Sequence, residues 1–168
     1  MENIIAEQLK KTSEVMIKEE LTVAVAESCT SGLIQHSFSQ AEGAMSFYQG
    51  GITAYNLGQK AKHLNINPIT AEKYNSVSEA IAKKMALQVA VNFNAECGIS
   101  ITGFGEPIPE KGVHSCFAYI AVAINSKIVC SKKIKGNSEE DLKENQMLYT
   151  EKVLSEFLIA LERTLNQK

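Results

Sequence analysis

The segment between Leu21 and Phe38 constrains the fold more than any other part of this 168-residue chain. An apolar run from Leu21 to Ala26 ends abruptly in small polar residues, and an apolar-periodic segment then opens with Leu33 and Ile34. This order predicts a buried strand, a tight turn and the first turn of a helix. The sequence therefore predicts a strand–turn–helix unit near the N-terminus.

The polar turn of this unit carries three hydroxyl or thiol side chains, Ser28, Cys29 and Thr30. The first N–H groups of a helix have no intrahelical partner, and the helix dipole adds partial positive charge there. Such a turn suits a bound anion or a developing oxyanion. Alternatively, Ser28 or Thr30 only caps the helix, and the local pattern favours neither interpretation.

Hydrophobic periodicity and capping signals predict the other elements. Helices are expected over residues 3–19, 31–40, 57–64 and 68–74. A Ser76-x-x-Glu79 capping box predicts the start of a longer helix that continues to Phe93, and a last helix is expected after Ser138. Strands are expected over residues 21–26, 47–55 and 97–101, with a hairpin over 115–124 and 127–134 and a loop over 102–113. This alternation argues for a single α/β domain over residues 1–168, with a mixed sheet covered by helices on both faces.

Composition limits the class of protein. Apolar residues make up 45% and charged residues 21% of the chain, which is typical of a soluble globular domain. The formal net charge of −2 gives no electrostatic case for nucleic acid or a membrane surface, and no apolar run is long enough to span a bilayer. The N-terminal residues do not resemble a secretory signal, so we expect a cytoplasmic protein.

Cysteines and histidines give no indication of a metal site. The four cysteines include no C-x-x-C pair and are expected to be free thiols, three of them in apolar runs and Cys29 in the polar turn. The three histidines are dispersed, without metal-ligand spacing. Gly103 and Gly105 begin like a dinucleotide fingerprint, but the third glycine is missing and Glu106 would repel a pyrophosphate. We therefore expect no metal and no cofactor.

The remaining candidates for catalytic residues are a set of hydroxyl side chains and one lysine. Ser28 ends the first expected strand and Thr102 follows the third, while the second is followed by Tyr55, Asn56 and Lys60. Because the carboxyl ends of parallel strands face one crevice, these groups can converge there. A lysine whose pKa is lowered by desolvation could activate a serine for acyl transfer on an amide. Spacing alone, however, favours a solvated helix position for Lys60, as for most lysines.

Four motifs run in order along nearly the whole chain. They are Ala26-Glu27-Ser28-Cys29-Thr30-x-Gly32, Gly51-x-x-x-Tyr55-Asn56-x-x-x-Lys60, Val77-Ser78-Glu79 and Ser100-Ile101-Thr102-Gly103. Their order and spacing resemble the CinA C-terminal domain family, the nicotinamide-nucleotide amidohydrolases. The resemblance implies a three-layer α/β/α sandwich with a five-stranded, mostly parallel mixed sheet, and it implies a homo-oligomer.

The same resemblance implies hydrolysis of the carboxamide of nicotinamide mononucleotide, or of a related amide, with release of ammonia. If the roles of the family's residues apply to the matching positions of this chain, Ser28 would be the nucleophile and Lys60 its activating partner. Tyr55 and Thr102 would orient the substrate or the oxyanion. The substrate-binding residues that it implies are Cys29, Thr30, Ser31, Gly32, Asn56 and Gly103. The expected partner is a small nucleotide or amide, and no metal, nucleic acid or membrane is implied.

The chain departs from the family pattern mainly in its loops. Ser31 precedes Gly32 where the family has a second glycine, and Phe104–Pro109 alters the family's Gly-x-Ala-Gly-Pro loop. Asn137 and Ser138 stand where the family places an arginine, a residue suited to a substrate phosphate. The lysines that could compensate are Lys132, Lys133, Lys135 and Lys143.

Two hypotheses from different classes follow. The first is an active amidohydrolase that uses Ser28 and Lys60. The second is a catalytically weakened relative that keeps the fold and binds a nucleotide-like ligand or a partner without turnover, which the loop around Glu106 and the absent arginine favour. The retained pair favours the enzyme, because the altered residues resemble specificity elements.

Overall fold

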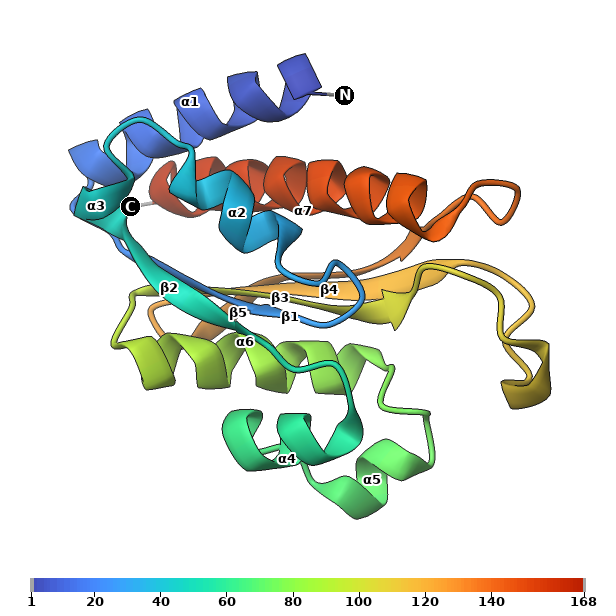
Figure 1. Cartoon of the computed structure of the whole chain (residues 1–168). Helices are drawn as coiled ribbons and strands as arrows, with labels where there is room; N and C mark the ends of the chain where they lie inside the picture. Colours follow the sequence, from blue (N-terminus) through green and yellow to red (C-terminus); the bar gives the residue numbers. More distant parts are fainter. Residues whose placement is uncertain (1, 168) are drawn as a thin grey trace.

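A five-stranded mixed sheet forms the middle layer of the fold (Figure 1). The computed structural model describes residues 2–167. The strands are β1 (Val23–Glu27), β2 (Tyr48–Thr53), β3 (Cys97–Phe104), β4 (Phe117–Ile124) and β5 (Lys127–Lys135), in the order β2-β1-β3-β4-β5. β1 pairs in parallel with β2 and β3, whereas the pairs β3–β4 and β4–β5 are antiparallel. Among the described strands β4 alone is therefore reversed, which confirms a mostly parallel mixed sheet.

Helices cover both faces of this sheet (Figure 1). One layer contains α1 (Glu2–Lys18), α2 (Leu33–Ser39), α3 (Ala44–Phe47) and α7 (Leu142–Leu165). The other contains α4 (Leu57–Leu64), α5 (Pro68–Glu72) and α6 (Glu79–Phe93), and a short 3-10 helix, η1 (Pro109–Lys111), interrupts the loop after β3. The three-layer α/β/α sandwich is thus confirmed. None of the helices in the described range is long and apolar enough to cross a membrane.

The apolar run predicted as the first strand is buried on both faces, as a central strand requires. Val23 and Val25 pack in one core cluster with Phe38 of α2, while Ala24 and Ala26 face the cluster formed by α4 and α6. This two-sided packing gives the turn that follows β1 a rigid base.

The predicted capping box at Ser76 is wrong, because α6 begins two residues later than that box requires. Ser78 caps the helix, and its side chain accepts a hydrogen bond from the Ile81 N–H at 3.2 Å. Ser76 has a φ of 61°, in the left-handed region, whereas an N-cap residue needs an extended backbone.

The loop predicted to start at Thr102 also starts later. Thr102 and Gly103 lie within β3, where they pair with Tyr119 and Ala118 of β4. A Cβ on Gly103 would come within 2.4 Å of the Ala118 backbone, so the close approach of β4 requires glycine there. The hairpin supplies these pairing partners from outside the segment, which a local pattern does not reveal.

Candidate active site

A carboxylate from the protein itself occupies the start of α2. Glu27 is fully buried, and its carboxylate oxygens accept hydrogen bonds from the hydroxyl of Thr30 at 2.6 Å and from the N–H groups of Gly32, Ile34 and Gln35 at 3.1, 3.2 and 2.8 Å. The N–H groups that a helix start leaves free are thereby satisfied internally. These groups are not available to a bound anion, and Glu27 supplies the cap that the alternative interpretation assigned to Ser28 or Thr30.

This arrangement leaves the hydroxyl of Ser28 free. Ser28 is 4% exposed, and within residues 2–167 its side chain makes no hydrogen bond. Cys29 beside it is buried, so the polar turn does not expose the thiol. From α7, the side-chain amide of Gln146 donates to the Cys29 carbonyl at 2.9 Å and to the Ser31 hydroxyl at 3.3 Å. The last helix thus fixes the turn that carries Ser28.

Lys60 reaches the same region from α4. The side chain of Asn56 caps this helix by accepting the Gln59 N–H at 3.0 Å. Lys60 is 2% exposed, and its Nζ donates to Thr102 Oγ1 at 2.9 Å and to the Ser76 carbonyl at 3.2 Å. The Thr102 hydroxyl in turn donates to the Ser76 carbonyl at 2.9 Å. The expectation of a solvated lysine is therefore wrong.

Burial changes the protonation of these groups. It lowers the pKa of Lys60 to about 8, although the Cys29 thiol nearby acts in the opposite direction. It raises the pKa of Cys29 to about 12. A neutral amine has two N–H groups and one lone pair. Because Thr102 and the Ser76 carbonyl accept two N–H groups, the lone pair of neutral Lys60 is left to accept a proton.

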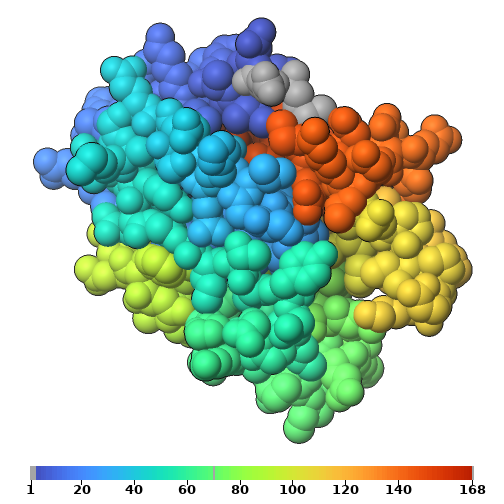
Figure 2. Space-filling view, in the orientation of Figure 1, coloured from blue at the N-terminus to red at the C-terminus, as the bar shows by residue number. Residues whose placement is uncertain are grey.

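Ser28 and Lys60 line one cavity of about 450 Å³. Four further residues predicted for the site share its wall, namely Cys29, Tyr55, Asn56 and Gly103. The remaining described wall consists of Leu57, Glu72, Asn75, Ser76, Val77, Phe104, Glu106, Ile108, Lys111 and Leu142. Two distant segments thus meet here, and Figure 2 shows the green residues 72–77 beside the yellow loop after β3. The predicted convergence at the carboxyl ends of the parallel strands is found.

Some predicted site residues do not reach this cavity. Thr30, Ser31 and Gly32 are absent from its described wall, because their turn is organised around the carboxylate of Glu27. Thr102 is fully buried and contacts the site through Lys60.

Sequence reasoning missed two contributors. Ser76 acts through its backbone carbonyl, which no pattern of side chains reveals. Lys111, in the Gly- and Pro-containing loop after β3, brings a cation to the cavity wall. Lys111 is the one lysine or arginine between residues 102 and 113, which was the available signal.

The four lysines expected to compensate for the absent arginine lie outside the described wall of this cavity. Lys132 pairs with Glu156 at 2.6 Å, and the Lys133 ammonium lies 4.0 Å from the centroid of the Phe117 ring. At the arginine position itself, the Asn137 N–H donates to Asn145 Oδ1 at 2.7 Å. That segment therefore has a structural role here.

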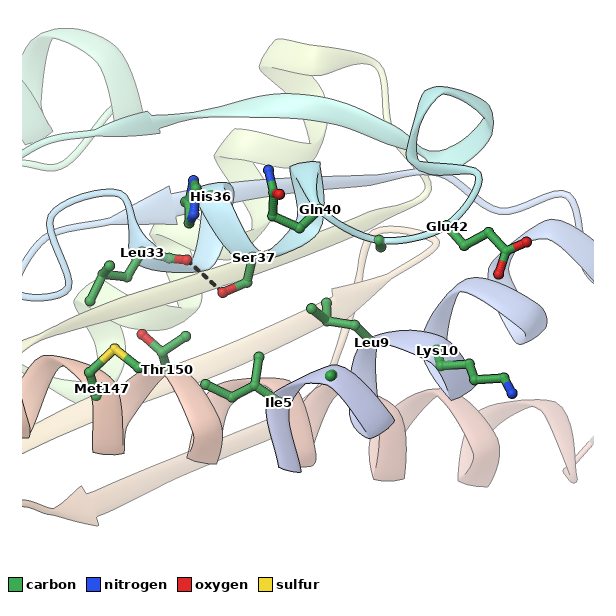
Figure 3. Close-up of a pocket in the computed structure, with 12 residues that line it drawn as sticks. Ile5, Leu9, Lys10, Leu33, His36, Ser37, Gln40, Glu42, Met147 and Thr150 are labelled. Atoms are coloured by element: carbon green, nitrogen blue, oxygen red, sulfur yellow. Dashed lines mark hydrogen bonds between the residues drawn. The ribbon is translucent and has the colours of Figure 1, made fainter. Parts of the chain in front are cut away.

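A second, larger cavity of about 550 Å³ lies between α1, α2 and α7 (Figure 3). Ile5 and Leu9 of α1, Leu33 of α2 and Met147 of α7 surround it. The described residues that line it include none of those predicted for the site. Within the described range, no group of three or more His, Cys, Asp or Glu side chains could hold a metal ion.

Comparison with known proteins agrees with the motifs. A family model described as the CinA C-terminal domain matches residues 5–161. A Clostridioides difficile protein named as competence-damage inducible is 35% identical over 154 residues, covering 90% of this chain and 36% of the relative. Protein MG115 of Mycoplasma genitalium is 32% identical over 157 residues, covering 92% and 93%. The chain thus spans little more than a third of some relatives.

Solved structures show the same fold. A CinA superfamily protein from Escherichia coli is 26% identical, with a TM-score of 0.85 over 92% of this chain and 88% of that one. A competence or damage-inducible protein from Enterobacter asburiae is 24% identical, with a TM-score of 0.87 over 94% and 98%. The chain therefore belongs to the CinA C-terminal domain family.

Proposed function

We propose that this chain is an amidohydrolase that releases ammonia from a carboxamide, with Ser28 as nucleophile and Lys60 as the base that activates it. The observation that carries the proposal is a buried, hydrogen-bonded lysine amine in the same cavity as a free serine hydroxyl. Nucleophilic catalysis by serine needs such a neighbouring base. No histidine stands in the described wall of the cavity to take this role.

The proposed reaction begins with neutral Lys60. Its amine takes the proton of the Ser28 hydroxyl as Oγ attacks the carboxamide carbon, which forms a C–O bond and a tetrahedral oxyanion. Collapse of this intermediate breaks the C–N bond, and the leaving nitrogen takes the proton from Lys60 and departs as ammonia. Water then attacks the Ser28 ester and gives a proton to Lys60, which returns it to Ser28 as the acid leaves.

Cys29, next in the chain, is a less suitable nucleophile. The thiolate is the reactive form of cysteine, and burial raises the pKa of Cys29 to about 12. A hydroxyl activated at the moment of attack does not depend on a stable anion. This difference favours Ser28.

The oxyanion needs a hydrogen-bond donor. The N–H groups at the start of α2 are taken by Glu27, and the hydroxyl of Thr102 donates to the Ser76 carbonyl. The hydroxyl of Tyr55, on the cavity wall, is the remaining donor among the residues predicted for orientation. We therefore assign Tyr55 to the oxyanion or the amide, and Thr102 to the positioning of Lys60.

The proposed substrate is nicotinamide mononucleotide or a related amide, as the family resemblance implies. A cavity of about 450 Å³ has a volume typical of small-molecule sites. The carboxylates of Glu72 and Glu106 on its wall are complementary to the cationic ring of this substrate. We also propose a cytoplasmic homo-oligomer, and a monomeric mass in solution would contradict the oligomer.

The test is ammonia release from nicotinamide mononucleotide and a small panel of other amides. Wild type is compared with Ser28→Ala and Lys60→Ala, and with Lys62→Ala as a matched control, since Lys62 is exposed on the same helix. The proposal expects release by wild type and Lys62→Ala and its loss in both site variants. No release from any amide would refute it, and tight binding of the mononucleotide without release would support the second hypothesis instead.

A further inference from the structure

The cavity wall carries four charged side chains in its described part, Lys60, Lys111, Glu72 and Glu106. Lys60 is buried and must be neutral to act as a base. Lys111 is exposed and makes no salt bridge within residues 2–167. Its ammonium is therefore the positive charge that the wall can offer to an anionic part of a ligand.

The loop that carries Lys111 is held in shape by its own backbone. Ile108 and Val113 form a two-way bridge, with N···O distances of 2.8 and 3.2 Å. Between them, the Lys111 N–H donates to the Ile108 carbonyl at 2.9 Å, and Gly112 closes the turn with a φ of 70°. A glycine tolerates this left-handed conformation without strain. Lys111 is thus presented from an ordered turn.

The position of Lys111 separates it from the reacting groups. Lys60 is 2% exposed beneath the wall, whereas Lys111 is exposed on the loop after β3. Asn75 and Lys111, from two segments far apart in the sequence, both line the cavity and are exposed. The base therefore lies at the buried end of the cavity. The open end carries the cation of Lys111 and the amide of Asn75, together with the exposed carboxylates of Glu72 and Glu106.

We propose that Lys111 is a specificity-determining residue that binds a phosphate monoester group of the substrate at the open end of the cavity. The inference rests on the proposed function for its reaction, but the binding it describes is measurable without turnover. Lysine binds phosphate as a point charge, and a phosphate monoester carries between one and two negative charges near neutral pH. With its phosphate at Lys111, a mononucleotide would direct its carboxamide toward Ser28 and Lys60.

The probes are nicotinamide mononucleotide and nicotinamide riboside, which differ by the phosphate alone. In Lys111→Ala the KM for the mononucleotide is expected to rise about fivefold, the upper range for a solvent-exposed charge pair, and further in Lys111→Glu. Both constants for the riboside should stay unchanged, because it lacks the phosphate. Equal changes for the two probes, or none for the mononucleotide, would overturn the inference.

Lys127→Glu is the matched control, since it makes the same change in net charge. Lys127 pairs with Ile124 at the end of the hairpin, and Ile124 pairs with Cys97 at the start of β3. Lys127 therefore lies at the opposite end of the sheet from the cavity. Its replacement by glutamate should leave the KM values for both probes unchanged. If Lys127→Glu raised the KM for the mononucleotide as much as Lys111→Glu does, the effect would come from long-range electrostatics, which would contradict a phosphate contact at Lys111.

The inference is separable from the reaction by calorimetric titration of both probes. If wild type releases no ammonia, the proposed function fails. The inference then requires mononucleotide binding that Lys111→Glu weakens and riboside binding that it leaves unchanged. No measurable binding of the mononucleotide to wild type would overturn it.

Discussion

The amine of Lys60 and the hydroxyl of Thr102 lie 2.9 Å apart, and both donate to the carbonyl of Ser76. The single hydroxyl proton of Thr102 goes to that carbonyl, so its oxygen is left to accept from Lys60. This three-way contact holds the amine in one orientation while its protonation changes. Three distant segments of the chain, α4, β3 and the turn before α6, must come together to form it.

Replacing Thr102 by valine keeps the shape of the side chain and removes the acceptor. In this variant the Ser76 carbonyl alone orients the Lys60 amine, so kcat for ammonia release should fall about tenfold, which corresponds to ~1.4 kcal/mol of lost transition-state stabilisation. Thr102→Ser keeps the hydroxyl and should retain most of the activity. Steady-state rates at saturating amide distinguish the two variants, and equal rates would show that the hydroxyl does not position Lys60.

Activity should increase with pH through about pH 8. Burial lowers the pKa of Lys60 to about 8, and the base must be neutral, so about a tenth of the molecules are competent at pH 7. Lys60→Arg should be inactive throughout, because arginine does not lose its proton. The measurement is kcat between about pH 6 and pH 9, where a flat profile would exclude Lys60 as the base.

The same lysine should limit stability at neutral pH. Below pH 8 both folded and unfolded chains carry a charged Lys60, and the folded state bears the full cost of burying it. Between about pH 8 and the usual value of 10.5 the unfolded chain binds more protons, so the free energy of unfolding increases with pH.

Lys60→Met removes that cost and leaves the Thr102–Ser76 hydrogen bond in place. A fall in pKa from 10.5 to about 8 corresponds to ~3 kcal/mol, and the two lost hydrogen bonds, at ~1 kcal/mol each, offset ~2 kcal/mol of it. The variant should therefore be about 1 kcal/mol more stable than wild type at pH 7, with a smaller difference near pH 10. Urea unfolding at both pH values measures this, and a variant less stable than wild type at pH 7 would disprove it.

Glu27 should be indispensable for the turn that carries Ser28. Glu27→Ala leaves the Thr30 hydroxyl and the N–H groups of Gly32, Ile34 and Gln35 without their acceptor, so the free energy of unfolding should fall by about 3 kcal/mol or more. Glu14→Ala on the exposed side of α1 is the control and should change it by less than about 0.5 kcal/mol. Similar urea midpoints for the two variants would contradict this role.

The sequence predicted the parts of the site that depend on strand ends. Ser28 directly follows β1, and Tyr55 and Lys60 follow β2, so a parallel pairing alone brings them to one edge of the sheet. The hydrophobic pattern also predicted the helices that cover both faces, except the four-residue α3 (Ala44–Phe47). These features are local in sequence, or follow from the direction of the strands.

The features of the site that the sequence did not predict depend on tertiary contacts. The burial of Lys60 follows from the packing of α4 against its neighbours and not from the helical period of α4. The sequence Ser76-Val77-Ser78-Glu79 offers two serines as caps, and the left-handed backbone at Ser76 decides for Ser78. The capping carboxylate of Glu27 comes from the end of a strand, where a charged residue is expected to be solvated.

The most direct test of the Ser28 mechanism is to map the covalent intermediate. Protein quenched in acid during turnover of nicotinamide mononucleotide is digested, and the peptide that contains Ser28 and Cys29 is fragmented by mass spectrometry. We predict a substrate-derived acyl group on Ser28, absent from Ser28→Ala and from Lys60→Met. An acyl group on Cys29, or one that persists in Ser28→Ala, would contradict the mechanism.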